Sequence, residues 1–319
     1  MLPDQEVSNH RDTGQEKTVT CFAPAKINLA LHVTGQHSDG YHELETLVVF
    51  CDIGDEIEIY HGSAPGSQPD GPRIDLANFG PYGETLPDPQ DNIVYKAAMA
   101  FTQEFLTGEQ SLTIRIEKNL PVASGIGGGS ADAAATLLAV QDLFETRDEK
   151  RMAAIAANLG ADVPMCLHSR ALIARGRGEQ IELLEEFPQL HMVLVNPGVC
   201  VSTPEVFGKL QDKQNPPLTP LPAKLTPDTL IRWLHQKRND LAAPALALAP
   251  EIHDVLEALR LSDALLRRMS GSGATCFGIY PSFESAENAA LQISQNQPGW
   301  WVKACKSRSF GKERKHNLR

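Results

Sequence analysis

Residues 121–138 read PVASGIGGGSADAAATLL, a glycine-dense loop that runs directly into a strongly helix-forming segment. Glycine lets a backbone turn tightly and brings its N–H groups close to a ligand, because no Cβ atom stands in the way. The following helix offers unpaired N–H groups and the positive end of its dipole. Together these features predict an anion-binding loop, for which phosphate is the usual ligand.

The surrounding sequence distinguishes this loop from a linker and from two common nucleotide loops. Residues 112–116, LTIRI, alternate like a strand, and an apolar helix follows the glycines, so a flexible linker is a poor interpretation. A Walker loop requires Lys and then Ser or Thr after its last glycine, but Gly129 is followed by Ser130 and Ala131. A dinucleotide-binding fingerprint fails because Ser130 stands where Gly or Ala is needed. The cation that balances the phosphates must therefore come from elsewhere in the chain.

Composition places the chain among soluble globular proteins. Its 319 residues allow two domains, 42% of them are hydrophobic, and the net charge of −11 argues against nucleic-acid binding by the whole surface. It contains no apolar run long enough to span a membrane, and residues 1–17 lack the apolar segment of a signal peptide. We therefore expect a cytoplasmic protein. Its cysteines lack metal-ligand or Cys-x-x-Cys spacing and mostly lie in apolar stretches, which predicts reduced, buried thiols at Cys21, Cys51, Cys166, Cys200, Cys276 and Cys305.

Hydrophobic periodicity predicts a mixture of helices and strands without strict alternation, which favours an α+β fold. The predicted strands are residues 52–60, 112–116 and 192–195, and the predicted helices are residues 92–105, 130–144 and 151–158, the last closed by Gly160. Two segments rich in Gly or Pro, residues 61–91 and 215–227, are predicted to be loops.

Two charged residues outside the glycine loop are candidates for chemistry. Lys26 shares one face of a predicted strand with Asn28 and His32, although on this segment alone a solvated strand face is the simpler interpretation. Asp162 is a single carboxylate in the apolar segment LGADVPMCL, residues 159–167, and is either a helix cap or turn residue, or a residue placed for catalysis. A phosphate loop, one cation and one placed carboxylate are together the set required for phosphoryl transfer to an alcohol. The carboxylate would accept the alcohol proton, while the lysine would attract the developing alkoxide.

Three segments in this order resemble the three motifs of the GHMP kinases: PAKIN at residues 24–28, the loop at residues 121–131, and SGSGATCF at residues 270–277. The resemblance implies the two-domain α+β GHMP kinase fold, with the active site in the interdomain cleft. The expected divisions are a disordered extension at residues 1–17, an ATP-binding N-terminal domain at 18–175, a C-terminal domain at 176–302, and a basic tail at 303–319. It also implies ATP and Mg²⁺, with no membrane or nucleic-acid partner, in a monomer or homodimer.

Four further segments narrow the resemblance within the family. They are residues 34–44, TGQHSDGYHEL; residues 159–164, LGADVP; residues 196–198, NPG; and residues 203–207, TPEVF. They are similar to members that use ATP to phosphorylate the 2-hydroxyl of a cytidine diphosphate-linked methylerythritol, in the non-mevalonate route to isoprenoids. A GHMP kinase for another small alcohol, such as homoserine or mevalonate, is the alternative. A regulator without catalysis is disfavoured because Lys26 and Asp162 are both present.

The resemblance also implies roles for individual residues. Lys26 and Asp162 would be catalytic, and Ser130 would lie near Mg²⁺. The ATP phosphates would bind at Pro121, Val122, Ala123, Ser124, Gly125, Ile126, Gly127, Gly128, Gly129, Ser130 and Ala131, and the ATP nucleoside near Asn92 and Lys118. The substrate would contact Asn28, Tyr41, His42, Thr203 and Phe207.

In this assignment Tyr41 and Phe207 sandwich the cytosine, and His42 forms a hydrogen bond with it. Other interpretations remain open at this stage. Phe207 would otherwise be a core residue of a helix capped by Thr203. His42 would otherwise be an ordinary loop histidine, and a metal site with His37 and Asp39 is the weaker alternative because loop spacing fixes no geometry. Asp132, close to the phosphate loop, is either a helix acid or a metal contact.

Overall fold

The computed structural model describes residues 17–61, 72–108 and 110–309. Backbone contacts divide the chain into two compact units. Unit 1 comprises Met1–Ala25, Ile53–Val122 and Gly127–Ser169, and unit 2 comprises Lys26–Asp52, Ala123–Ile126 and Arg170–Arg319. Two long strands that pair with each other, β1 (Lys17–Gln36) and β2 (His42–His61), run through both units. The units are therefore discontinuous in sequence, a division that the predicted contiguous domains did not include.

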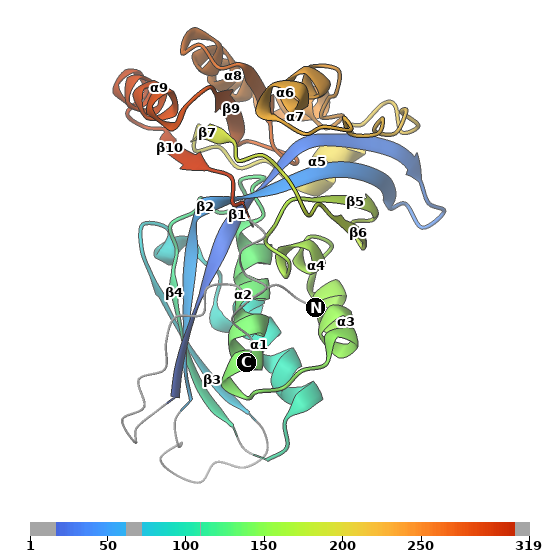
Figure 1. The fold of residues 1–319 in the computed structure, drawn as a ribbon. Helices are drawn as coiled ribbons and strands as arrows, with labels where there is room; N and C mark the ends of the chain where they lie inside the picture. Colours follow the sequence, from blue (N-terminus) through green and yellow to red (C-terminus); the bar gives the residue numbers. More distant parts are fainter. Residues whose placement is uncertain (1–16, 62–71, 109, 310–319) are drawn as a thin grey trace. The chain divides into compact units, whose positions relative to one another are not determined.

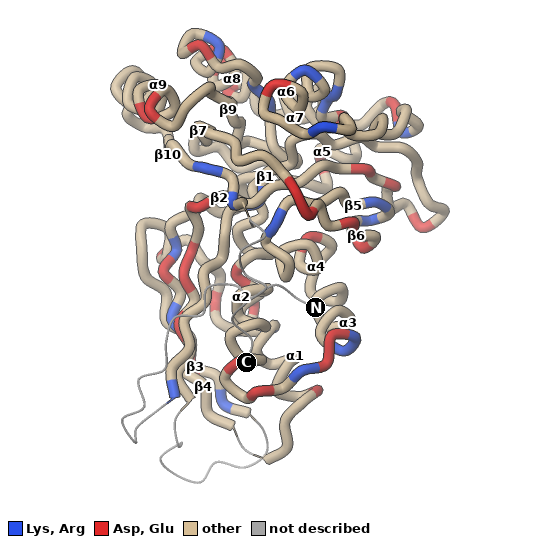
Figure 2. The backbone as a smooth tube through the Cα atoms, in the orientation of Figure 1, with Lys and Arg blue, Asp and Glu red and all other residues tan. Residues whose placement is uncertain are grey.

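Unit 1 combines strands with four helices (Figure 1). Strand β4 (Ser111–Glu117) pairs antiparallel with the second half of β2 and parallel with β3 (Arg73–Phe79). Alternate residues of β4 are buried, and Glu58 of β2 lies opposite Arg115, with 3.8 Å between their charged atoms. Figure 2 shows acidic and basic positions along the strands of this unit. The helices that pack together are α1 (Ile93–Phe105), α2 (Gly128–Leu143), α3 (Glu149–Leu159) and α4 (Val163–Cys166), and two short 3₁₀ helices span Gly83–Thr85 and Pro89–Asp91.

Local signals predicted most of unit 1, with one error. The helix predicted at residues 92–105 is confirmed as α1, with Asn92 as its N-cap, and the strand predicted at 112–116 is confirmed as β4. Helix α2 begins two residues earlier than predicted, because Gly127 adopts φ +65° and serves as its N-cap. The loop predicted at residues 61–91 is wrong for residues 73–79, which form β3; residues 62–71 lie outside the described residues.

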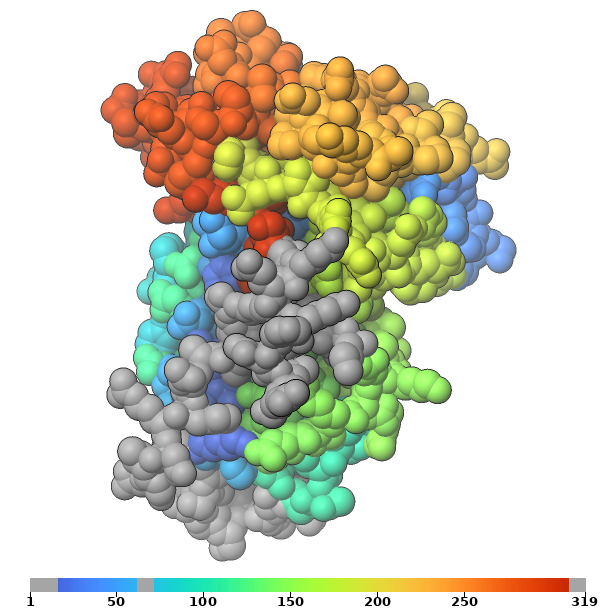
Figure 3. All heavy atoms as spheres, viewed as in Figure 1, coloured from blue at the N-terminus to red at the C-terminus, as the bar shows by residue number. Residues whose placement is uncertain are grey.

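Unit 2 contains an antiparallel sheet in the order β10–β7–β9–β8, against which α8 and α9 pack (Figure 1). The strands are β7 (His191–Asn196), β8 (Leu266–Met269), β9 (Cys276–Tyr280) and β10 (Trp301–Lys306). The helices are α5 (Thr203–Gly208), α6 (Pro227–His235), α7 (Ala242–Leu248), α8 (Glu251–Leu261) and α9 (Phe283–Asn296), and the last four (gold to red) form a closely packed block in Figure 3. Strands β5 (Leu172–Gly176) and β6 (Gln180–Leu183) form a hairpin whose first strand pairs with the first half of β2.

Several predictions concern unit 2 or whole-chain properties. The strand at residues 192–195 is confirmed within β7, while Lys303 to Lys306 of the predicted basic tail belong to β10. Residues 1–16 of the predicted extension and residues 310–319 of the tail lie outside the described residues. All six cysteines are free thiols; five are buried as predicted, but Cys200 is exposed. Within the described residues, every helix falls short of the length and apolar character that a membrane span requires.

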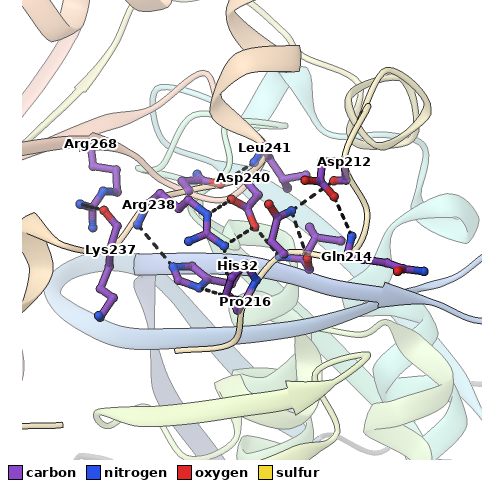
Figure 4. A network of polar contacts seen from close by, with 12 residues as sticks. His32, Asp212, Gln214, Pro216, Lys237, Arg238, Asp240, Leu241 and Arg268 are labelled. Atoms are coloured by element: carbon purple, nitrogen blue, oxygen red, sulfur yellow. Dashed lines mark hydrogen bonds and ion pairs between the residues drawn. The ribbon is translucent and has the colours of Figure 1, made fainter. Parts of the chain in front are cut away.

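The polar face of β1 is buried, so the solvated strand face considered for this segment is wrong. Lys26 and Asn28 are each 3% exposed and His32 is 2% exposed. Figure 4 shows how His32 is satisfied: its Nδ1 lies 2.9 Å from the carbonyl of Pro216, and its Nε2 accepts from the backbone N–H of Arg238 at 3.4 Å. Because a carbonyl can only accept, Nδ1 must carry the proton and the imidazole is neutral. Asp240 completes the network by accepting from the N–H of Val33, 2.8 Å, and from Arg238 Nε, 2.5 Å.

Stability should depend on the neutral form of His32. Burial, supported by the positive charges of Arg238 and Lys237, lowers the pKa of His32 below 6.5, whereas the Pro216 carbonyl and Asp240 oppose this shift. The unfolded chain therefore binds the proton more readily, and the stabilisation present above pH 6.5 is lost as the pH falls below that value and through the lower pKa of the folded state.

We expect His32→Gln to cost about 1–3 kcal/mol at pH 7.5, because two hydrogen bonds of a buried ring are lost. Melting temperatures measured between pH 7.5 and 5.5 should fall less steeply for the variant than for the parent protein. Parallel curves would contradict a buried neutral imidazole.

Candidate active site

The phosphate loop enters helix α2 through a left-handed glycine in unit 1. The N–H of Ala131 donates to the carbonyl of Gly127 at 2.8 Å and is the first bond of the helical ladder. The N–H groups of Gly128, Gly129 and Ser130 precede that bond, and Gly129 is exposed. A first helical turn of this kind can hold an anion through its backbone donors. The predicted contact of Ser130 with Mg²⁺ stays a prediction, and the described residues contain no group of three or more His, Cys, Asp or Glu side chains arranged to hold a metal ion.

A buried charge cluster lies under the first turn of α2. Lys118 Nζ donates to Asp55 Oδ2 at 2.6 Å and to Asp132 Oδ2 at 2.5 Å. Asp55 also accepts from the N–H groups of Asn119, 2.6 Å, and Leu120, 2.8 Å. A Cβ atom on Gly128 would lie 3.2 Å from Lys118 Nζ, so glycine permits this close approach. The ammonium of Lys118 is thus engaged by two carboxylates, and its predicted place near the ATP nucleoside stays a prediction.

Asp132 and Asp55 differ in how well they are satisfied. Burial raises the pKa of Asp132 to about 7, against the opposing charge of Lys118. Oδ1 of Asp132 is buried and has no hydrogen-bond partner among the described residues, whereas both oxygens of Asp55 accept bonds. We conclude that the charged form of Asp132 is the less well satisfied of the two carboxylates, in keeping with its raised pKa. Of the two interpretations left open for Asp132, neither included this contact with Lys118.

Asn92 and Asp162 occupy the N-cap positions of two helices in unit 1 and use them differently. Asn92 Oδ1 accepts from the N–H of Val94 at 2.9 Å and caps α1, while its Nδ2 is buried without a partner among the described residues. Asp162 precedes α4, but its side chain accepts no capping hydrogen bond from that helix. Asp162 therefore lies in a turn at the N-cap position without capping α4 through its side chain. Its catalytic role stays a prediction.

In unit 2, residues 123–126 of the glycine loop pack against residues 270–275 of the third motif. Ser270 Oγ donates to the carbonyl of Gly125 at 3.0 Å, and the N–H of Thr275 donates to the carbonyl of Ser124 at 3.0 Å. Gly125 has φ +77°, and a Cβ atom there would lie 2.6 Å from the carbonyl oxygens of Ser270 and Gly273. Only glycine fits this position, so the two motifs can touch only with glycine at residue 125.

Strand β1 brings the first motif to the same place in unit 2. The N–H of Lys26 donates to the carbonyl of Ile126 at 2.8 Å, and the N–H of Asn28 donates to Ser270 Oγ at 3.1 Å. The side chain of Asn28 has a fixed orientation: its Nδ2 donates to Thr46 Oγ1 at 2.8 Å, because that hydroxyl already donates to the carbonyl of Ala30 at 2.7 Å. Asn28 Oδ1 is left buried without a partner among the described residues. Asn28 therefore presents a hydrogen-bond acceptor.

The predicted base-binding residues also lie in unit 2. The rings of His42 and Phe207 stack with centroids 4.8 Å apart and an interplanar angle of 25°, whereas Tyr41 is 60% exposed. Burial, supported by the charge of Lys213, lowers the pKa of His42, which makes the imidazole neutral at physiological pH. His42 Nε2 is buried without a partner among the described residues. Phe207 is half-buried, and the fully buried residue of α5 is its neighbour Val206.

Two alternatives for this region are wrong. Thr203 does not cap α5, because Ser202 occupies the N-cap position and the Thr203 hydroxyl lies 2.7 Å from Ser272 Oγ instead. The metal site of His37, Asp39 and His42 does not form, because His37 Nε2 contacts Glu43 at 2.6 Å and Asp39 forms an ion pair with Arg177.

Comparison with known proteins places this geometry in a family. Residues 92–170 match the GHMP kinases N terminal domain, and residues 224–299 match the GHMP kinases C terminal domain. The protein named 4-diphosphocytidyl-2-C-methyl-D-erythritol kinase from Agrobacterium fabrum is 48% identical over 301 residues, 93% of this chain and 99% of the relative. The chain belongs to the GHMP kinase family. The protein of the same name from Paracoccus denitrificans is 49% identical over 283 residues, 88% of this chain and 94% of its own.

Solved structures agree with this family. A crystal structure named 4-(cytidine 5'-diphospho)-2C-methyl-D-erythritol kinase superimposes with TM-score 0.72 at 31% identity and covers 91% of this chain and 100% of that one. Homoserine kinase from Cytophaga hutchinsonii, at 19% identity and TM-score 0.62 over 95% of this chain and 97% of that one, shares the fold. The α+β two-domain prediction is confirmed, and this GHMP kinase is an ATP-dependent small-molecule kinase.

Sequence reasoning missed several residues that hold this GHMP kinase site. Asn239 is buried, and its Nδ2 donates to the carbonyls of Met269 and Gly271, each at 2.8 Å. These carbonyls flank Ser270, so Asn239 fixes the backbone of the third motif on both sides of this residue. Asn239 Oδ1 also accepts from the N–H of Leu241 at 3.0 Å, a contact that is ordinary for an asparagine in a turn. Only the tertiary contacts reveal its role.

Lys118 should be a major contributor to the stability of unit 1. We expect Lys118→Met to cost about 3–5 kcal/mol in chemical unfolding, because it leaves the carboxyl groups of Asp55 and Asp132 buried without a cation. Lys96→Met is the matched control, since Lys96 forms an exposed ion pair with Asp91 at 3.8 Å, and it should cost under about 1 kcal/mol. Equal unfolding midpoints for the two variants would show that the buried cluster contributes nothing.

Proposed function

We propose that this kinase transfers the γ-phosphoryl group of ATP to the 2-hydroxyl of 4-diphosphocytidyl-2-C-methyl-D-erythritol. The proposal rests chiefly on the relatives of that name, which align with this chain over almost their full length. The stacked pair of His42 and Phe207 supports the cytidine part of the substrate. The unpaired oxygen of Asn28 supports the sugar-alcohol part.

A pyrimidine base suits the groups around His42. Phe207 and Tyr41 offer aromatic faces, and stacking of a base on such a face contributes about 1–3 kcal/mol. The edge of cytosine presents both a donor and acceptors, and a neutral imidazole can complement either kind. The low pKa of His42 keeps its ring neutral, and its buried Nε2 otherwise has no partner among the described residues. An unpaired buried polar atom costs about 1–3 kcal/mol, which a bound base would remove.

Asn28 suits a polyol for a similar reason. Its Nδ2 is committed to Thr46, so the side chain can offer a ligand only the acceptor oxygen. Hydroxyl groups donate to such an oxygen, whereas phosphate oxygens do not. We therefore place a hydroxyl of the methylerythritol moiety, rather than a phosphate, at Asn28.

We assign the chemistry to Asp162 and Lys26. The Asp162 carboxylate would accept the proton of the 2-hydroxyl as the oxygen attacks the γ-phosphorus, and the Lys26 ammonium would stabilise the charge that develops on that oxygen. The N–H groups at residues 128–130 would hold the phosphates, and the unpaired Nδ2 of Asn92 would donate to the ATP nucleoside. Mg²⁺, held in part by Ser130, would neutralise the charge of the leaving diphosphate. The mechanism requires the two catalytic side chains to reach one hydroxyl.

The direct test follows the reaction by phosphorus NMR, with the protein incubated with MgATP and the cytidine substrate. We expect a new monoester resonance next to an intact diphosphate signal. Homoserine and mevalonate serve as competing acceptors. Phosphorylation of either one, together with insensitivity to millimolar CMP or CDP, would replace the proposed substrate.

The base role of Asp162 has its own test. Asp162→Asn should lower kcat about 10²–10⁴-fold, because the amide cannot accept the proton, while ATP binding measured by calorimetry stays within twofold. Asp148→Asn is the matched control, since Asp148 is also a helix N-cap and its side chain accepts from the N–H of Arg151 at 3.0 Å. An Asp162→Asn enzyme as fast as the Asp148→Asn enzyme would remove the base role.

The Phe207 ring should affect substrate binding rather than the chemical step. Phe207→Ala should raise KM for the cytidine substrate roughly 5- to 100-fold and leave kcat within about twofold, because base stacking is lost in the ground state and transition state alike. Phe79→Ala controls for loss of an exposed ring, since Phe79 contacts Arg115 in unit 1. If CMP inhibits both variants equally, Phe207 does not contact the base.

A further inference from the structure

Tyr41 has a partner outside the family motifs, the guanidinium of Arg177. The Arg177 Cζ lies 4.5 Å from the centroid of the Tyr41 ring, and the same guanidinium forms an ion pair with Asp39. All three residues belong to unit 2, but Arg177 comes from the turn between β5 and β6, far along the chain from Tyr41. The guanidinium covers one face of the ring and leaves the other face uncovered by it.

The turn that carries Arg177 is built to hold it in place. Gly176 and Gly178 both have positive φ, +72° and +118°, so the chain reverses sharply around Arg177. The N–H of Arg177 donates to Glu179 Oε2 at 2.6 Å, and the N–H of Gly178 donates to the carbonyl of Arg175 at 3.1 Å. The backbone of Arg177 is therefore fixed independently of its side chain.

The turn that carries Tyr41 depends on Asp39. Asp39 Oδ1 accepts from the N–H of Tyr41 at 3.1 Å, while its Oδ2 accepts from Arg177. The N–H of His37 donates to the carbonyl of Tyr41 at 2.7 Å and closes the turn. Asp39 thus connects the backbone of Tyr41 to the cation that covers its ring. With 60% of Tyr41 exposed, this contact is the ring interaction that the structure gives it.

We propose that Arg177 is a positioning residue for substrate recognition: it holds the Tyr41 ring so that the opposite face receives the base. The inference rests on the proposed function, since it assumes that Tyr41 stacks on cytosine. Asp39 balances the charge of Arg177, so Arg177 acts through the orientation of the ring rather than through long-range attraction of the substrate's diphosphate. An exposed side chain that is ordered before binding loses less freedom when the ligand arrives.

The test compares Arg177→Gln with the parent enzyme. We expect KM for the cytidine substrate and Kd for CDP to rise roughly 3- to 10-fold, with kcat and KM for ATP unchanged. Arg177→Lys should retain part of the affinity, because an ammonium also pairs with Asp39 and sits over the ring. Arg151→Gln is the matched control: Arg151 also pairs with an aspartate, Asp148, and lies 5.0 Å over a ring, Phe105, but in unit 1. It should change neither constant.

A double-mutant cycle separates positioning from direct contact. In a Tyr41→Ala background, Arg177→Gln should have no further effect on Kd for CDP, since the ring that it orients is gone. An undiminished effect there would mean that Arg177 contacts the substrate itself and would overturn the inference. So would tighter binding by the single Arg177→Gln variant, because Arg177 would then occupy the face that the base needs.

The two proposals can fail separately. If the parent enzyme phosphorylates the cytidine substrate and Arg177→Gln matches it in every constant, the positioning role is wrong and the proposed function stands. If the parent enzyme neither binds CDP nor phosphorylates the substrate, the proposed function fails and the inference fails with it. Melting temperatures of all variants within a few degrees of the parent would exclude unfolding as the cause of a changed KM.

Discussion

The approach of two backbone segments in unit 2 is the constraint on which the rest of the site depends. Residues 123–126 and 270–275 exchange hydrogen bonds at a separation that a Cβ atom on Gly125 would prevent. Ser270 Oγ also accepts from the N–H of Asn28 in β1, and Asn239 donates to the carbonyls on both sides of Ser270. Residues 123–126 of the phosphate loop are therefore held by two other segments of unit 2. A bulkier residue at 125 would displace all three motifs, not only the loop that contains it.

The cations of Lys118 and Arg268 have hydrogen-bond partners, whereas several buried neutral side chains keep an atom without one among the described residues. The ammonium of Lys118 has two carboxylates, and the guanidinium of Arg268 donates to the carbonyls of Leu29, Leu234 and Lys237. Asn28, His42 and Asn92, in contrast, each keep one buried atom without a partner among the described residues. Such atoms are costly unless a ligand satisfies them. Lys118 and Arg268 are thus satisfied within the fold, whereas Asn28, His42 and Asn92 are residues that the family resemblance assigns to ligands.

Features encoded locally could be predicted from the sequence, and features that need distant partners could not. The glycine loop, helix α1 and the alternating strand β4 were predictable because their signals lie within a few residues. Strand β3 was missed because the segments around it are rich in Gly and Pro. Its parallel partner β4 is also distant in the sequence. The buried face of β1 was also missed, because His32 and Asn28 look like solvent-facing residues until Pro216, Arg238 and Thr46 are known to meet them.

The candidate site divides in the same way. The glycine loop indicated phosphate from its own residues, but the roles of Tyr41, His42 and Phe207 came from family resemblance, since no local pattern brings residue 42 to residue 207. Asp132 illustrates the limit most clearly, because neither of its predicted roles included Lys118, and only the fold reveals that the two share a buried site with Asp55. A lysine at the end of an alternating strand gives no sign that it will be fully enclosed.

The two aromatic rings of the proposed base site, Phe207 and Tyr41, are held in place by different interactions. Phe207 is half-buried, stacks on His42 and follows Val206, which anchors α5 in the core. Its position is therefore fixed by packing, and little freedom remains to be lost when a base arrives. Tyr41 lies in an exposed turn, where packing cannot fix a ring, and polar contacts replace it: Asp39 holds the backbone and Arg177 covers one face. Packing is insensitive to salt, whereas an exposed ion pair is screened by it. The contribution of Tyr41 to the affinity for the base should accordingly fall as ionic strength rises, whereas the contribution of Phe207 should not change.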